Sequence, residues 1–191
     1  MYYVLDYFGA INPCRWITSY PYVEDMDFDL GKKITVAVPD PLEINLDPMD
    51  KEASDQGPEM PVYFKGQIPI CRDDLIQSMK DVGVTNLDIY NVRIFDPDSG
   101  KHIINYKAVN IVGVVAIADM KRSDATVHIG GPVIDVDFDN LVIDPSKTSS
   151  LLIFRLAEST NTILVNDKLR CHLLAQGYDK LQFLDPTKVA T

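Results

Sequence analysis

Two stretches of the chain share one pattern of apolar and polar positions. The first, "CRDDLIQSMKDVGVTNLDI" (71–89), aligns without a gap with a second that contains "NDKLRCHLLAQGYDKLQF" (166–183), 94 positions later. The alignment pairs Leu75 with Leu169, Met79 with Leu173, Gly83 with Gly177, Leu87 with Leu181, and Ile89 with Phe183. In each stretch an aspartate precedes apolar residues four apart, and a glycine follows them. This order predicts a short helix with a glycine cap in both places.

Apolar residues at a spacing of two flank both predicted helices. They are Ile68 and Ile70 before the first helix, Leu87 and Ile89 after it, Ile163 and Val165 before the second, and Leu181 and Phe183 after it. A spacing of two is the period of a strand with one buried face, so each unit is predicted to be strand, helix, strand. Such units are common in α+β proteins, and the pattern leaves open whether the two arose by duplication or independently.

Further apolar runs predict the remaining strands. They cover residues 1–8, Lys32–Val38, Asn110–Met120, 133–143 and 151–158. The run Asn110–Met120 is almost continuously apolar, which is typical of a central strand covered on both faces. The turn signal "DPDSG" (96–100) predicts a hairpin. The segment 39–61 is rich in proline and acid without a sustained period, and it is predicted to be a surface loop.

These elements predict one α+β domain over residues 1–191. We expect a mixed or mostly antiparallel sheet, few short helices and the two similar strand-helix-strand units. A chain of 191 residues is long enough to bury one sizeable core.

Composition and net charge indicate which cellular compartment and which kinds of partner to expect. No apolar run reaches the length that spans a bilayer, and the start "MYYVLDYFGAIN" lacks the basic residues of an export signal, so we expect a cytoplasmic protein without membrane contact. The net charge of −10 argues against binding to nucleic acid and suits a basic partner better. Three widely spaced cysteines, Cys14, Cys71 and Cys171, are expected to be small buried apolar residues.

The sequence contains no catalytic or metal-binding motif that we can support. Asp135, Asp137 and Asp139 have the spacing of a calcium loop, but Asn140 replaces its glycine and Ser146 its final glutamate. Strict alternation with apolar residues favours instead a strand with one acidic face. The three histidines have no partners at metal-ligand spacing, and no serine or cysteine lies in a nucleophile motif. We therefore expect no enzyme activity, cofactor or metal.

The order of these features resembles immunity family eleven of bacterial polymorphic toxin systems, once catalogued as a domain of unknown function. The resemblance covers most of the chain, and its motifs are diffuse. It is carried by "YYVL", "PICRDDLIQSMKDVGVTNLDIYNVRI", "YKAVNIVGVVAIADMKRSD", "LVIDPSKTSSLLIFRLAE" and "ILVNDKLRCHLLAQGYDKLQFLDP". Lys180 departs from the small residue that members of the family tend to have shortly before the last aromatic.

The resemblance implies a non-catalytic α+β protein that protects the producing cell by binding the toxin encoded beside it. If that toxin is a basic nuclease, acidic residues suit the contact. The candidates are Glu24, Asp25, Asp27 and Asp29 in one stretch and Asp135, Asp137 and Asp139 in another. An uncharacterised cytosolic enzyme and a non-catalytic adaptor module are the alternatives, marked respectively by convergent titratable groups and by a large exposed apolar patch.

Overall fold

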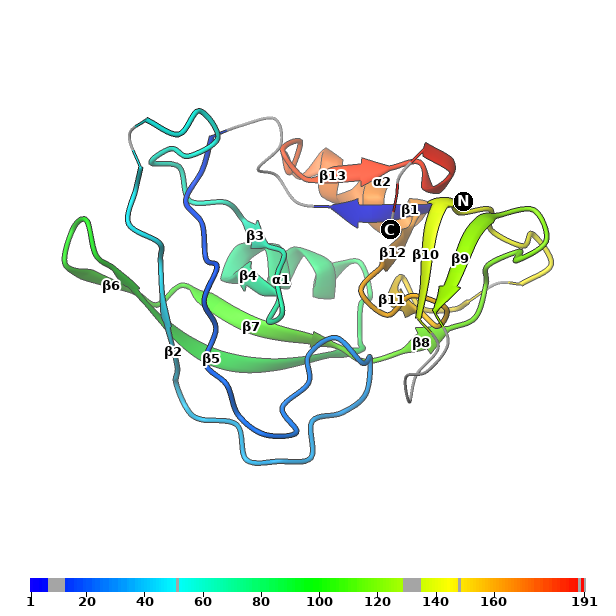
Figure 1. Ribbon diagram of the computed structural model, residues 1–191. Helices are drawn as coiled ribbons and strands as arrows, with labels where there is room; N and C mark the ends of the chain where they lie inside the picture. Colours follow the sequence, from blue (N-terminus) through cyan, green and yellow to red (C-terminus); the bar gives the residue numbers. More distant parts are fainter. Residues whose placement is uncertain (7–12, 51, 129–134, 148, 189, 191) are drawn as a thin grey trace.

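The structure, a computed structural model, describes residues 1–6, 13–50, 52–128, 135–147, 149–188 and 190; of Asp135 it describes the backbone alone. Its elements in chain order (Figure 1) are β1 (Tyr2–Asp6), β2 (Leu42–Asn45), β3 (Tyr63–Phe64), β4 (Ile70–Arg72), α1 (Asp73–Asp81), β5 (Leu87–Asp96), β6 (Lys101–Ile103), β7 (Tyr106–Ile111), β8 (Val114–Val115), β9 (Asp124–His128), β10 (Asp135–Asn140), β11 (Ile153–Leu156), β12 (Ile163–Asn166), α2 (Asp167–Ala175), β13 (Gln182–Leu184) and the 3₁₀ turn η2 (Pro186–Lys188). Two short α-helices with mixed sheets confirm the predicted α+β class for the described part of the chain.

The first strand-helix-strand unit is β4-α1-β5, and its two strands do not touch. Strand β7 lies between them and pairs antiparallel with both, so that Ala108 faces Ile70 on one side and Tyr90 on the other. Strand β3 pairs with the outer edge of β4, β2 lies parallel to β5, and β6 forms the predicted hairpin with β5. The unit is therefore a split β-α-β arrangement, in which a third strand separates the two parallel ones.

The second unit, β12-α2-β13, repeats this arrangement with β1 as the separating strand. Val4 faces Leu164 on one side and Leu184 on the other. Leu164 and Leu184 are the residues that the 94-position alignment pairs with Ile70 and Tyr90. Strand β11 pairs with the outer edge of β12, as β3 does with β4. The two predicted units thus have the same topology and the same register.

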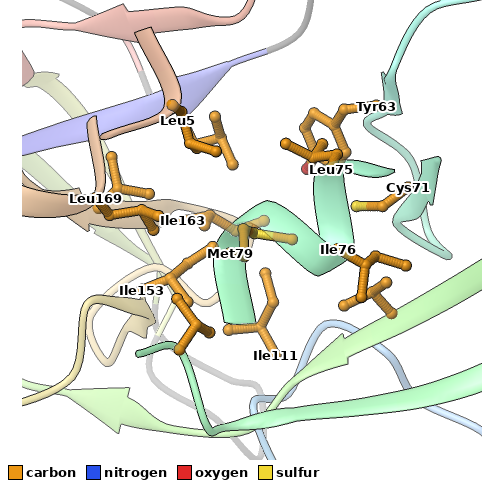
Figure 2. Packing of buried hydrophobic residues seen from close by; sticks show 14 of the residues in the cluster. Leu5, Tyr63, Cys71, Leu75, Ile76, Met79, Ile111, Ile153, Ile163 and Leu169 are labelled. Carbon is orange, nitrogen blue, oxygen red and sulfur yellow. The ribbon is translucent and has the colours of Figure 1, made fainter. Parts of the chain in front are cut away.

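The units share one hydrophobic core. The paired residues Leu75 and Leu169 are both buried in it, as are Met79 and Leu173. Both sheets add residues to this core, including Leu5 and Ile163 from one and Cys71 and Ile111 from the other (Figure 2). The helices also touch at equivalent positions, since Ser78 Oγ lies 3.2 Å from His172 Nε2. Contact between equivalent residues is what a pseudo-two-fold axis between the units produces.

The opposite face of each sheet is covered by a separate segment. Met26 and Phe28, from the long stretch before β2, pack against the six-stranded sheet with Leu42 and Ile94. The β9–β10 ribbon packs Val136 and Phe138 against the five-stranded sheet with Phe154 and Leu164. Each sheet therefore has one face toward the shared core and one face under a cover.

The structure corrects the predicted strand at Lys32–Val38 and the predicted loop at 39–61. Lys32–Val38 has no regular secondary structure. The strand lies within the supposed surface loop, at β2, where Leu42 and Ile44 are buried; Leu46, directly after β2, is also buried. "LEINL" alternates apolar and polar residues, but the prolines on both sides masked that period.

The predicted central strand at Asn110–Met120 is also corrected. Strand β7 ends at Ile111, and β8 begins at Val114 in the other sheet. Gly113 lies between them with a φ of 141°, in the backbone region that side chains rarely adopt. A Cβ on Gly113 would also approach Leu151 Cδ1 to 2.7 Å. Gly113 therefore lets the chain cross from one sheet to the other.

Candidate functional site

The acidic stretch Glu24–Asp29 lies in the cover of the six-stranded sheet. Glu24, Asp25 and Asp27 are exposed, and Asp29 is half-buried. Tyr22, which precedes them, has 89% of its surface exposed. Lys32 and Lys33 follow and offset part of the negative charge. The stretch thus presents three carboxylates and an aromatic ring to solvent.

Buried side chains hold this acidic loop, which we define as residues 22–29. Met26 and Phe28 alternate with the exposed acids and enter the hydrophobic cluster under the sheet. The Phe28 ring makes an edge contact with Tyr90, with centroids 5.5 Å apart. Asp25 has a φ of 61°, and Met26 N donates to Val23 O at 3.1 Å, which closes a turn at the exposed acids. Aspartate is among the residues that tolerate this left-handed backbone.

One hydrogen bond fixes the end of the loop at the junction of the two sheets, and two more fix the residues that directly follow it. Arg155 Nη2 donates to Phe28 O at 2.8 Å, and Gly113 N donates to Gly31 O at 2.8 Å. Asn110 Nδ2 donates to Lys32 O at 2.7 Å. Figure 1 shows the segment that precedes β2 running along the outer side of β5 and β7 and reaching the region of β8. The loop is therefore irregular in backbone but anchored along its length.

The second predicted group lies on β10, in the cover of the other sheet. Val136 and Phe138 are buried, while Asp137 and Asp139 are exposed, so the predicted alternation is confirmed where the side chains are described. The side chain of Asp135 lies outside the described part. Asp137 is not isolated, because its Oδ2 lies 2.7 Å from His128 Nε2 on the paired strand β9.

The two acidic groups are not brought together. They lie on covers of different sheets, and within the described residues no hydrogen bond or ion pair joins them. The acidic loop is the better candidate, since its exposed acids have no ion-pair partner in the described part of the chain, whereas Asp137 has His128.

Arg155 is the residue that sequence reasoning missed. It is 2% exposed, and its two hydrogen bonds to carbonyl oxygens join the acidic loop to Thr160 near the end of β11. The available signal was an arginine inside the apolar run "LLIFRLA", where a charged side chain is unexpected. The exposed Tyr22 was also missed, because a single aromatic residue in a polar segment has no distinctive pattern.

Three features of the described residues bear on catalysis and metal binding. Ser78 and His172 are close together, but Ser78 is buried, and among the described residues no carboxylate hydrogen-bonds to His172. Burial raises the pKa of the Cys71 thiol to about 12, which keeps it protonated at neutral pH. Within the part of the chain that is described, no three histidine, cysteine or acidic side chains converge as metal ligands.

The cysteine prediction needs one correction. Cys14 and Cys71 are buried as expected, but Cys171 is exposed. It lies on α2 away from Leu169 and Leu173, which form the buried face of that helix. A helix with apolar residues four apart buries one stripe only, and Cys171 falls outside it.

Comparison with known proteins adds no relative: no family model matches the sequence, and no curated protein matches it. The resemblance to immunity family eleven therefore stays a prediction. Of the helices in the described residues, neither has the length and apolar character needed to cross a membrane.

Proposed function

We propose that this protein is an immunity protein that binds and neutralises a toxin encoded by a neighbouring gene. In this proposal it works in the cytoplasm without a cofactor and catalyses no reaction. Its partner is the toxin domain, with a basic nuclease as the favoured type, and it binds neither nucleic acid nor membrane. Occlusion of the toxin's active site is the proposed mode of inhibition.

The anchored acidic loop is the observation that carries the proposal. Its exposed carboxylates lie on a segment whose alternate residues, Met26 and Phe28, are buried. An anchored loop loses less conformational entropy on binding than a free one, so more of the contact energy appears as affinity. Neutralisation of a lethal enzyme requires such affinity, on the order of −12 kcal/mol for a nanomolar complex.

The negative charge of the protein and the exposed tyrosine of the loop both suit a basic partner. The net charge of −10 favours encounter with a positively charged protein. Tyr22 stands beside the carboxylates, and an exposed tyrosine can contact an arginine or lysine through its ring while the acids pair with neighbouring cations. A stable complex buries roughly 800 Å² on each partner, so the loop would form the centre of a larger interface.

The decisive experiment is co-expression with the protein of the neighbouring toxin gene, followed by a pull-down and a measurement of association rate. We expect rescue of growth and a stable complex. Rescue without a physical complex would reject blocking and favour the enzyme alternative.

A charge-matched pair of variants locates the interface. The test variant is Glu24→Gln/Asp25→Asn/Asp27→Asn, in which asparagine preserves the left-handed backbone at position 25. The control is Glu52→Gln/Asp55→Asn/Asp179→Asn, which removes three exposed carboxylates elsewhere. We expect the test variant to associate about tenfold more slowly at low salt and with a weaker salt dependence, while the control changes little. Equal effects of the two variants would remove the loop from the interface.

A further inference from the structure

A small cavity opens beside the acidic loop and is lined by residues of β3 in the six-stranded sheet and of β11 and β12 in the five-stranded sheet. Its volume is about 200 Å³. Tyr63 and Arg155, each 2% exposed, form its floor with Ile163. Exposed residues form its rim: Lys65, Gly66, Gln67 and Asn161. The cavity is therefore accessible from solvent and has a buried polar floor.

The floor carries hydrogen-bond donors that the protein does not use. Arg155 Nη1 donates to Thr160 O at 2.6 Å and Nη2 donates to Phe28 O, but Nε has no partner in the described residues. A guanidinium has five N–H donors, so each Nη nitrogen also keeps a second one. The Tyr63 hydroxyl is likewise buried with no partner in the described part of the chain. Two fully buried polar groups thus lack acceptors beside the same cavity.

The charge of Arg155 is not matched by a contacting carboxylate. Within the described residues it forms no ion pair, and the acid that shares its cavity, Asp29, lies beyond ion-pair distance. Burial lowers the pKa of Arg155, and the nearby Tyr63 and Asp29 oppose that change. Lys65 at the rim is paired with Asp6 at 2.9 Å. A buried cation without a contacting anion is unfavourable, and an anion in the cavity would relieve it.

We propose that this cavity binds a small carboxylate ligand, with Arg155 and the Tyr63 hydroxyl as its donors. A planar guanidinium can donate to both oxygens of a carboxylate, and Arg155 Nε and the Tyr63 hydroxyl are the donors left without a partner in the described residues. Asp29 on the cavity wall disfavours a second negative charge, so the dianionic form of phosphate should bind more weakly than a carboxylate. The volume lies below that of sites for drug-sized molecules, so the ligand is small. The proposal does not rest on toxin binding, although Asp29 belongs both to the cavity wall and to the acidic loop.

The test is a titration of the full chain with sodium acetate at pH 7, with sodium chloride at equal ionic strength as the reference. Saturable binding should appear in the melting temperature and in calorimetry, because a ligand that binds the folded state stabilises it. Sodium phosphate, as a second arm, should bind more weakly than acetate. An acetate effect no larger than that of chloride would overturn the proposal and leave a cavity filled by water. Tighter binding of phosphate would overturn the assignment to carboxylates.

Two variants separate a binding role from a structural one. Tyr63→Phe removes only the hydroxyl, so acetate affinity should fall about tenfold while the stability without acetate stays unchanged. Asp29→Asn removes the competing charge, so acetate affinity should rise several-fold. If Asp29 instead serves as the structural counterion of Arg155, Asp29→Asn will lower stability without acetate and will not tighten binding. That result, with no effect of Tyr63→Phe, would also reject the site.

Discussion

The six-stranded sheet with α1 and the five-stranded sheet with α2 are the two halves of the molecule. They share one strand arrangement around the helix unit, but the strands follow one another in a different order along the chain. In the first half, the separating strand β7 follows the strand-helix-strand unit; in the second, the separating strand β1 comes from the other end of the chain. Ala108 and Val4 nevertheless occupy equivalent places between equivalent residues. The register of a half therefore depends on which side chains face the core and not on the order in which the strands are connected.

The helix starts show where the halves differ. Asn166 precedes α2 and caps it, since its side chain accepts a hydrogen bond from Leu169 N at 3.0 Å. Arg72 stands at the same place before α1 and makes no such bond; it pairs with Asp74, whose Oδ1 accepts from Leu75 N at 2.9 Å. The features that the halves share are buried or conformationally special, whereas Arg72 and Asn166, which differ, are half-buried.

Substitutions in the shared core should lower the free energy of unfolding the most. Leu75→Ala and Leu169→Ala should each lower the free energy of unfolding by about 2 to 5 kcal/mol, because both leucines are almost fully buried and leave cavities. Urea unfolding measures the loss. Lys80→Ala and Lys168→Ala, at exposed positions of the same helices, are the matched controls and should change it by less than about 0.5 kcal/mol. A leucine variant that behaves like its control would show that the two halves do not share the core equally.

The capping glycines give an intermediate effect. Gly83 and Gly177 have φ values of 106° and 87°, and a Cβ on either would meet no atom closer than 3.9 Å. A side chain at either position would therefore destabilise the fold through backbone strain alone. Gly83→Val and Gly177→Val should each lower the free energy of unfolding by about 1 to 2 kcal/mol, measured by thermal or urea unfolding. Gln176→Val, at the preceding position with a φ of −85°, is the control. A large loss at one glycine and none at the other would contradict the equivalence of the halves.

These shared features are also what the sequence could predict. Leucines four apart and a following glycine report local geometry, so both helices and their glycine ends were predicted correctly. The four flanking strands also exist, but Ile68 and Leu181 lie just outside β4 and β13. The separating strands could not be assigned to their units, because nothing in the local pattern of "YYVLD" or "YKAVN" states which strands will pair with it.

The predictions from sequence were wrong where contacts between distant parts of the chain determine the structure. Lys32–Val38 has β-branched residues but pairs with no strand in the described part of the chain, whereas Leu42–Asn45 pairs with β5 despite the prolines on both sides of it. For the candidate site, the acidic residues and their alternation with apolar ones were visible in the sequence. Their separation onto two covers, and the role of Arg155 beneath one of them, depend on contacts between residues more than 100 positions apart, such as Arg155 with Phe28.

Substitutions at the residues that precede α1 and α2 should lower the free energy of unfolding by smaller amounts. Asn166→Ala removes the acceptor of Leu169 N and should cost about 1 kcal/mol in urea unfolding. Arg72→Ala removes no capping bond and should cost less, since its ion pair with Asp74 is partly exposed to solvent. Equal losses at the two positions would mean that the cap of α2 contributes nothing specific.

Exchange of the cap between the halves should have the smallest effect of all. The backbone at Arg72 is extended, with φ −69° and ψ 145°, close to the −82° and 165° of Asn166, so asparagine fits there as a cap. Arg72→Asn should nevertheless change the free energy of unfolding by less than about 0.5 kcal/mol, because Asp74 already accepts from Leu75 N and the exposed ion pair is lost.

The double variant Arg72→Asn/Asp74→Lys reproduces the residues of the second half, Asn166 and Lys168, and removes the competing acceptor. Relative to Asp74→Lys alone, it should therefore recover about 1 kcal/mol in urea unfolding, because the new asparagine becomes the acceptor for Leu75 N. No recovery would mean that the two helix starts are not interchangeable. A loss above about 2 kcal/mol for Arg72→Asn alone would instead assign Arg72 a structural role through its contact with the buried Tyr106, a role that Asn166 does not have.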